Sequence, residues 1–187
     1  MLMGRAARRV FIGIPAGKEL REQVLEFRKR HDWLRVGWIR PENLHLTVIP
    51  PWLIENPESV CTALGDAAHH FSAADVEFTT VSTGPDAAKP RLIWATGKTT
   101  PFFSILRDAL YARIPLERTD ERSFLLHLTI ARVMPDEQDA IARMKLRVPV
   151  VWSPCLRTIS LYESILNPNG AEYRVLYEVP FAMNKQQ

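Results

Sequence analysis

One five-residue pattern occurs twice in this chain, and it constrains the fold more than any other feature. Residues 44–48 read Leu-His-Leu-Thr-Val and residues 126–130 read Leu-His-Leu-Thr-Ile, so that His127 follows His45 by 82 positions (127 − 45). Each copy alternates apolar with polar residues, as a β-strand with one buried face does. The repeat therefore predicts two similar lobes, each presenting one histidine and one threonine from the same face of a strand.

The residue types in the repeat indicate proton transfer at a phosphate. One histidine on a half-buried strand is more often structural, but a duplicated structural strand has no reason to keep an imidazole and a hydroxyl on one face twice. Two imidazoles can serve as general base and general acid near neutral pH. Threonine hydroxyls two residues further on, about 6.5–7 Å along the strand, suit the non-bridging oxygens of a phosphodiester. The candidate site is therefore His45, Thr47, His127 and Thr129.

Other kinds of site find less support. A zinc site needs three or four ligands, and neither motif strand has a carboxylate or a cysteine two positions after its histidine. The sequence contains no G-x-S-x-G, no Walker loop and no G-x-G-x-x-G. Cys61 and Cys155 are single, which suggests two reduced residues rather than a disulfide. We expect neither a metal nor a cofactor.

Apolar periodicity predicts a mixture of helices and strands. Helices are expected at 18–30, from Pro57 onward, at 101–114 and at about 136–146. Strands are expected at 10–14, 35–39, 44–48, 76–82, 91–96, 124–132, 156–166 and 172–179, with a hairpin turn at 167–170. Pro50 and Pro51 are expected to end the first motif strand. This order indicates an α/β (α+β) fold of largely antiparallel sheets packed by helices, in one domain over residues 1–187.

Charge is unevenly distributed along the chain. Residues 1–40 hold ten Lys or Arg against four acids, while the whole chain has a net charge of +3. A basic segment is compatible with RNA, but Arg28-Lys29-Arg30 could equally be the solvated end of a helix. No apolar run approaches the length of a membrane span, and the start lacks a signal-peptide core. We therefore expect a cytoplasmic protein with no membrane segment.

The two His-x-Thr motifs resemble those of the two-histidine phosphoesterase superfamily, and the chain is most similar to its LigT-type, 2'-5' RNA ligase-like RNA 2',3'-cyclic phosphodiesterases. The likeness covers most of the chain, through residues 9–15, 38–48, 90–95, 127–132, 161–164, 170–171 and 173–176. It implies a bilobal fold of two pseudo-symmetric lobes, with the motifs facing each other across an active-site cleft. It also implies metal-independent opening of a 2',3'-cyclic phosphate at an RNA end to a 2'-phosphomonoester.

The resemblance assigns a role to each motif residue. His45 would donate a proton to the departing ribose oxygen, and His127 would accept one from water. Thr47 and Thr129 would hold the phosphate oxygens. Arg132 could add a cation near the phosphate, although an external ion pair at the strand end is an equal alternative.

The sequence departs from the family beside both motifs. Ile49-Pro50-Pro51-Trp52 follows the first motif in place of the usual Lys/Phe-Leu-Gly type of segment, and Leu126 stands where proline is common. The four motif residues are unchanged, but the altered cleft rim leaves the exact substrate open.

Two other functions remain open beside cyclic phosphate hydrolysis. The chain could be a module that binds RNA ends without turnover, or an enzyme for another cyclic phosphate or a 2'-5' linkage, including the reverse ligation. Trp38 and Trp52 could stack a base, although packing in the core is favoured for both. We read His31, His69 and His70 as surface residues, and we expect a monomer.

Overall fold

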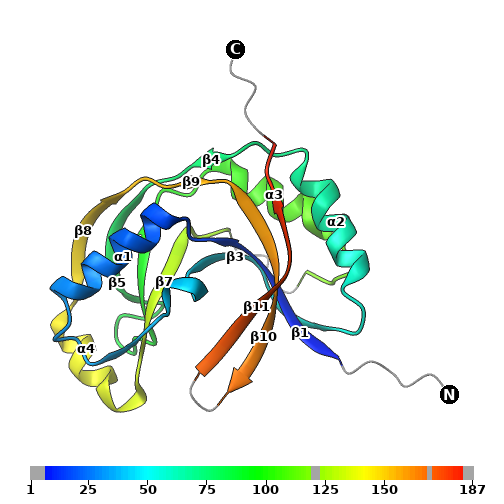
Figure 1. The fold of residues 1–187 in the computed structure, drawn as a ribbon. Helices are drawn as coiled ribbons and strands as arrows, with labels where there is room; N and C mark the ends of the chain where they lie inside the picture. Colours follow the sequence, from blue (N-terminus) through cyan, green and yellow to red (C-terminus); the bar gives the residue numbers. More distant parts are fainter. Residues whose placement is uncertain (1–6, 119–122, 168–169, 183–187) are drawn as a thin grey trace.

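The computed structural model describes residues 7–118, 123–167 and 170–182, which form two antiparallel sheets with helices packed against them (Figure 1). The first sheet has the order β11-β10-β1-β3. Its strands are β1 (Arg8–Pro15), β3 (His45–Ile54), β10 (Thr158–Asn167) and β11 (Gly170–Pro180). This lobe therefore combines the beginning and the end of the chain.

The second sheet comes from the middle of the chain and has the order β2-β7-β6-β5-β8. Its strands are β2 (Val36–Trp38), β5 (Phe78–Gly84), β6 (Leu92–Gly97), β7 (His127–Val133) and β8 (Arg147–Trp152). All of its strand pairs are antiparallel. Each sheet thus contains one of the two motif strands, β3 in the first and β7 in the second.

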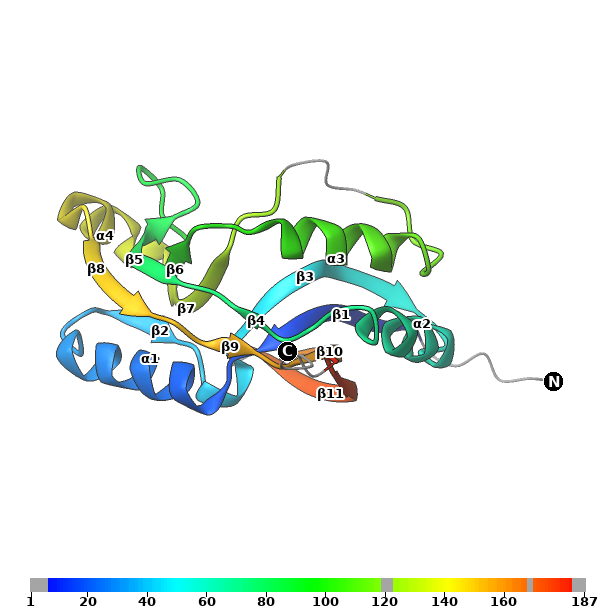
Figure 2. The same cartoon turned by 90° about the horizontal axis from the view of Figure 1, so that it is seen from above.

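The helices lie on different sides of this pair of sheets. They are α1 (Lys18–Arg30), α2 (Glu58–Ala68), α3 (Pro101–Tyr111) and α4 (Gln138–Met144). Seen from above, α1 lies on the opposite side of the molecule from α3, which runs beside β3 (Figure 2). The helix α2 contacts β10, β11 and α3. None of the helices in the described ranges is long and apolar enough to cross a membrane.

The apolar stripe predicted for α1 is the face that the helix buries. Leu20, Val24 and Phe27 recur at helical spacing and are all buried. The Phe27 ring meets the ring of Trp38 on β2 edge-on at 6.5 Å and that of Trp152 on β8 at 6.0 Å. Because β2 and β8 are the two edges of the second sheet, the sheet curves so that both edges pack against α1.

One hydrophobic cluster connects the two lobes. It contains Ile12 and Leu46 from the first sheet together with Ile93 and Leu128 from the second. Burial of apolar area in one continuous core stabilises both sheets at once. We infer that the two lobes form a single domain.

Two predictions about strands were wrong. The strand β3 does not end at Pro50 and Pro51 but continues to Ile54. It lies at the edge of its sheet, and among the described strands it pairs only with β1. An edge strand tolerates proline because one side needs no ladder hydrogen bonds. The strand expected to start at residue 124 begins at His127.

The predicted elements missed one strand of the second sheet and a short ladder. The helix expected at about 136–146 is a 3-10 turn at Pro135–Glu137 followed by α4, after which β8 was not predicted. The short pair β4 (Ala74–Asp75) and β9 (Cys155–Leu156) was also missed. Part of the hairpin turn expected at 167–170 lies outside the described residues.

Several side chains have surroundings that the sequence left open. Trp38 and Trp52 pack against the core, as favoured. His69 and His70 are exposed, as predicted, but His31 is half-buried and stacks on Phe27 with ring centroids 4.0 Å apart.

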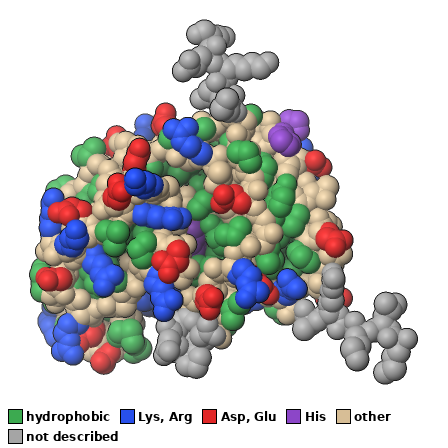
Figure 3. Space-filling view, viewed as in Figure 1, with side chains coloured by type: hydrophobic (Ala, Val, Ile, Leu, Met, Phe, Trp, Pro, Cys, Tyr) green, Lys and Arg blue, Asp and Glu red, His purple; other side chains and the backbone are tan. Residues whose placement is uncertain are grey.

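The basic residues at the end of α1 form a mixed surface. Lys29 and Arg30 pair with Glu26, and acidic and basic side chains alternate over α1 on the left of the space-filling view (Figure 3). This supports the interpretation of Arg28-Lys29-Arg30 as a solvated helix end.

Candidate active site

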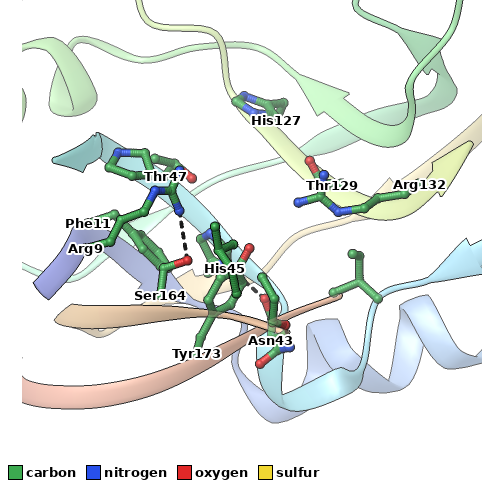
Figure 4. Close-up of a pocket in the computed structure, with 14 residues that line it drawn as sticks. Arg9, Phe11, Asn43, His45, Thr47, His127, Thr129, Arg132, Ser164 and Tyr173 are labelled. Atoms are coloured by element: carbon green, nitrogen blue, oxygen red, sulfur yellow. Dashed lines mark hydrogen bonds between the residues drawn. The ribbon is translucent and has the colours of Figure 1, made fainter. Parts of the chain in front are cut away.

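The two motif strands place all four of their polar side chains around one cavity of about 360 Å³ between the sheets. His45 and Thr47 extend from β3, and His127 and Thr129 face them from β7 (Figure 4). The alternation of residues does not show that β3 and β7 face each other, because they belong to different sheets; that expectation came from the family resemblance. Their polar faces nevertheless meet, as two lobes with one motif each would require.

Both motif strands have a bulge directly after their threonine. In β7, Thr129 lies opposite Trp94 and Ala131 lies opposite Ile93. Ile130, between them, has no partner on β6. In β3 the register shifts at the equivalent place. A bulge interrupts the alternation of side chains, and it brings Arg132 back to the side of the sheet that carries Thr129. Arg132 therefore lines the cavity, which supports the phosphate-binding interpretation over the external ion pair.

The ring of His45 is held from several sides. Its Nδ1 lies 2.7 Å from the carbonyl oxygen of Asn43. Since a carbonyl only accepts hydrogen bonds, Nδ1 carries the proton and Nε2 is the atom available for chemistry. Phe11 packs against the ring at 4.7 Å and Tyr173 meets it edge-on at 5.2 Å. A Cβ at position Gly13 would lie 3.2 Å from His45 Cδ2, so the ring also packs closely on the neighbouring strand.

This enclosure changes the proton affinity of His45. Burial lowers its pKa from 6.5 to about 4; the hydrogen bond to the Asn43 carbonyl opposes the shift, and the charges of His127 and Arg132 add to it. Desolvation acts in this direction because it disfavours the charged imidazolium. At neutral pH, His45 is therefore uncharged and its Nε2 can accept a proton.

His127 repeats the same local arrangement in the other lobe. Its Nδ1 lies 3.0 Å from the carbonyl oxygen of Leu125, two residues earlier, as Asn43 precedes His45 by two residues. Both rings thus donate through Nδ1 to the chain just before the strand. The ring of Trp94 meets His127 edge-on at 5.3 Å. Each histidine is oriented by one backbone hydrogen bond and by aromatic contacts.

A second arginine lines the cavity from the first lobe. Arg9, on β1, donates a hydrogen bond from Nη1 to Ser164 Oγ on β10 at 2.8 Å, and both residues line the cavity. The other lining residues beyond the predicted five are Phe11, Ile39, Asn43, Pro51, Leu166, Ala171 and Tyr173. Arg9 and Phe11 lie two residues apart on β1, so the sequence indicates that their side chains share one face of the strand. The pairing of β1 with β3 and β10 then shows that this face borders the cavity.

The cavity suits an anion. Its described lining includes Arg9 and Arg132, and none of the described lining residues is Asp or Glu. Guanidinium groups and threonine hydroxyls are donors that match phosphate oxygens. Within the described ranges, no group of three or more His, Cys, Asp or Glu could hold a metal ion.

Comparison with known proteins gives relatives across nearly the whole chain. Residues 17–160 match the 2'-5' RNA ligase superfamily. A protein of Methanocaldococcus jannaschii named RNA 2',3'-cyclic phosphodiesterase is 24% identical, covering 91% of this chain and 99% of its own. A protein of the same name from Thermotoga maritima is 28% identical, covering 92% and 95%.

Solved structures share the fold. TT0787 of Thermus thermophilus aligns with a TM-score of 0.71 at 22% identity, covering 94% of this chain and 99% of that one. Escherichia coli LigT in its apo form aligns with a TM-score of 0.67 at 22% identity, covering 95% and 99%. The predicted α+β architecture of mainly antiparallel sheets is thus confirmed. Because the family match spans 144 of the 187 residues (160 − 17 + 1), this chain belongs to the 2'-5' RNA ligase superfamily.

Proposed function

We propose that this protein hydrolyses the 2',3'-cyclic phosphate at the end of an RNA to a 2'-phosphomonoester, without a metal ion, with His45 and His127 as the acid–base pair. The observation that carries this proposal is the convergence of both motifs on one cavity that also contains Arg9 and Arg132. The superfamily match and the names of the two curated relatives support a phosphodiesterase.

The geometry allows a balanced sequence of bond changes. His127 Nε2 accepts a proton from a water molecule whose oxygen forms a new bond to phosphorus. The bond between phosphorus and the ribose 3'-oxygen breaks, and His45 Nε2–H donates its proton to that oxygen. Thr47 and Thr129 donate hydrogen bonds to the non-bridging oxygens, whose negative charge grows in the transition state. The proton then returns from His127 to His45 through solvent.

This direction of proton transfer requires a charged His45, whereas burial keeps the ring neutral at neutral pH in the free protein. A phosphodiester anion beside the ring favours the imidazolium and raises the pKa of His45. We therefore propose that His45 takes up a proton as substrate binds. Substrate binding without proton uptake would assign the opposite roles, with neutral His45 accepting the proton of water.

The experiment uses an oligoribonucleotide with a 2',3'-cyclic phosphate end, in the presence of EDTA, and separates the possible products by chromatography. We expect the wild-type protein to form the 2'-phosphate, and both His45→Ala and His127→Ala to lose this activity. Persistence of the cyclic end at the rate of the double variant would refute the proposal. Unchanged RNA affinity in the histidine variants, with no turnover by the wild type, would instead indicate a module that binds RNA ends.

Each chain contains both motifs and therefore a full set of proposed catalytic groups. We accordingly propose that the protein acts as a monomer on RNA. Two results would support this: the active protein sediments with the mass of one chain, and its activity is proportional to its concentration.

A further inference from the structure

A second cavity, of about 520 Å³, adjoins the catalytic one and shares Thr47 and His127 with it. Its wall includes Arg91 and Trp94 from the β6 region, Arg107 and Tyr111 from α3, and Phe124 just before β7. We propose that this cavity binds the nucleotide that precedes the cyclic phosphate end, so that the enzyme favours an RNA chain over a mononucleotide. This inference rests on the proposed function.

Trp94 lines the second cavity and projects from the face of the second sheet that carries Thr129. It lies opposite Thr129 in the ladder between β6 and β7, and cross-strand partners project from the same face. Its indole lies directly on the backbone of Gly84, where a Cβ would overlap the ring. The ring is therefore fixed beside His127, which it meets at 5.3 Å. A nucleotide chain leaving the catalytic pair on this side meets an aromatic surface at once.

Phe124 gives the second cavity another fixed aromatic side chain. Its ring stacks on that of Phe103 with centroids 4.5 Å apart and an interplanar angle of 1°. Phe103 is fully buried, so it anchors Phe124 to the core. A ring packed on one face and lining a cavity loses little conformational entropy when a base contacts it. Aromatic side chains of this kind bind bases with little sequence preference.

The charge of the second cavity matches the linking phosphate of an RNA chain. Arg91 and Arg107 line it, and no Asp or Glu occurs among its described lining residues. The hollow between α1 and β8 has an acidic lining instead, with three glutamates (Glu19, Glu22 and Glu26) and one arginine, Arg30. Of these two hollows, the one that touches the catalytic groups is the one that would attract a phosphodiester.

The connectivity of RNA determines which nucleotide would occupy this cavity. At a 2',3'-cyclic end both the 2' and 3' oxygens are bonded to the terminal phosphorus, so the chain continues only through the 5' oxygen of the last nucleotide. With the cyclic phosphate between His45 and His127, the chain therefore leads away from the catalytic pair. The second cavity borders the catalytic one at both Thr47 and His127, and it can receive the linking phosphate and the preceding base.

The test compares adenosine 2',3'-cyclic phosphate with the dinucleotide that ends in the same nucleoside cyclic phosphate. We expect kcat/KM of the wild type to favour the dinucleotide by roughly 5- to 150-fold, the equivalent of 1–3 kcal/mol for one stacked base. Arg91→Ala and Phe124→Leu should each reduce this ratio. Arg143→Ala removes an exposed arginine from a different hollow and should leave the ratio at its wild-type value.

Salt dependence gives an independent readout. The dinucleotide carries one additional phosphate, so log kcat/KM should fall with log salt more steeply than for the mononucleotide, by about 0.7. Arg91→Ala should reduce this difference and Arg143→Ala should not. Arg91 is exposed, so its replacement tests the proposal even if Phe124→Leu fails to fold.

The outcomes separate this inference from the proposed function. Equal kcat/KM for the two substrates in the wild type, or an equal loss for both in Arg91→Ala, would overturn the inference while leaving cyclic phosphate hydrolysis in place. Absence of turnover with both substrates would refute the proposed function itself.

Discussion

Replacing His45 with glutamine tests whether the folded protein holds this imidazole uncharged. The pKa of His45 is about 4 in the folded chain, against 6.5 for an unperturbed imidazole. Between these values the unfolded chain binds more protons than the folded one, so the wild type loses stability as the pH falls from 6.5 toward 4. The glutamine variant has no imidazole at this position, so it does not lose the stability that protonation of His45 in the unfolded chain takes from the wild type.

The size of the effect follows from the two pKa values. From near pH 7.5 to near pH 5, the linkage relation gives a loss of about 2 kcal/mol from His45 alone. Well above pH 6.5 the imidazole is neutral in both states and contributes no pH dependence. Carboxylates and the other histidines titrate in both proteins, so their contributions cancel in the comparison.

The assay is urea unfolding of the wild type and of His45→Gln near pH 7.5 and near pH 5, with the free energy of unfolding extrapolated to water. We expect the wild type to lose about 2 kcal/mol more than the variant on acidification. His69→Gln, which removes an exposed imidazole at the end of α2, is the matched control for loss of a histidine. Equal losses in the wild type and His45→Gln would refute the reasoning.

Three further predictions concern activity. The acid limb of kcat/KM should have its midpoint near pH 4 rather than 6.5, because the free enzyme contains the low-pKa His45; a midpoint near 6.5 would contradict this. Binding of adenosine 2'-phosphate should consume protons, measured by calorimetry in two buffers of different ionisation enthalpy; a heat that does not depend on the buffer would contradict it. Thr129→Val should lower kcat/KM by roughly 10- to 150-fold, the value of a hydrogen bond to a charged group, with recovery in Thr129→Ser, whereas loss in both would indicate a structural role.

The sequence predicted the part of the site that depends on local alternation. His45 and Thr47 share a face because they lie two residues apart on one strand, and the same holds for His127 and Thr129. Arg132 is different, since its odd spacing from Thr129 predicts the opposite face. Its inclusion came from the family resemblance, and its physical reason is the bulge in β7. There two consecutive apolar residues, Ile130 and Ala131, shift the alternation by one position.

The rest of the site depends on contacts between distant segments. Arg9 reaches Ser164 because β1 pairs with β10 in a register that places Val10 opposite Glu163. That register joins residues more than 150 positions apart, and nothing local to either strand specifies it. The lowered pKa of His45 is likewise a property of enclosure, because Phe11 and Tyr173 come from opposite ends of the chain.

The two prolines in β3 have a consequence for how the molecule meets other proteins. A strand at the edge of a sheet offers unpaired N–H and C=O groups that can pair with another chain. The register of β3 against β1 shifts at Pro50 and Pro51, and this bulge twists the edge of the sheet. Neither proline has an N–H group that an added strand could use. The strand that carries His45 can therefore extend to Ile54 while its exposed border is a poor template for an added strand. The two prolines that were expected to end the strand thus protect it from edge-to-edge association instead.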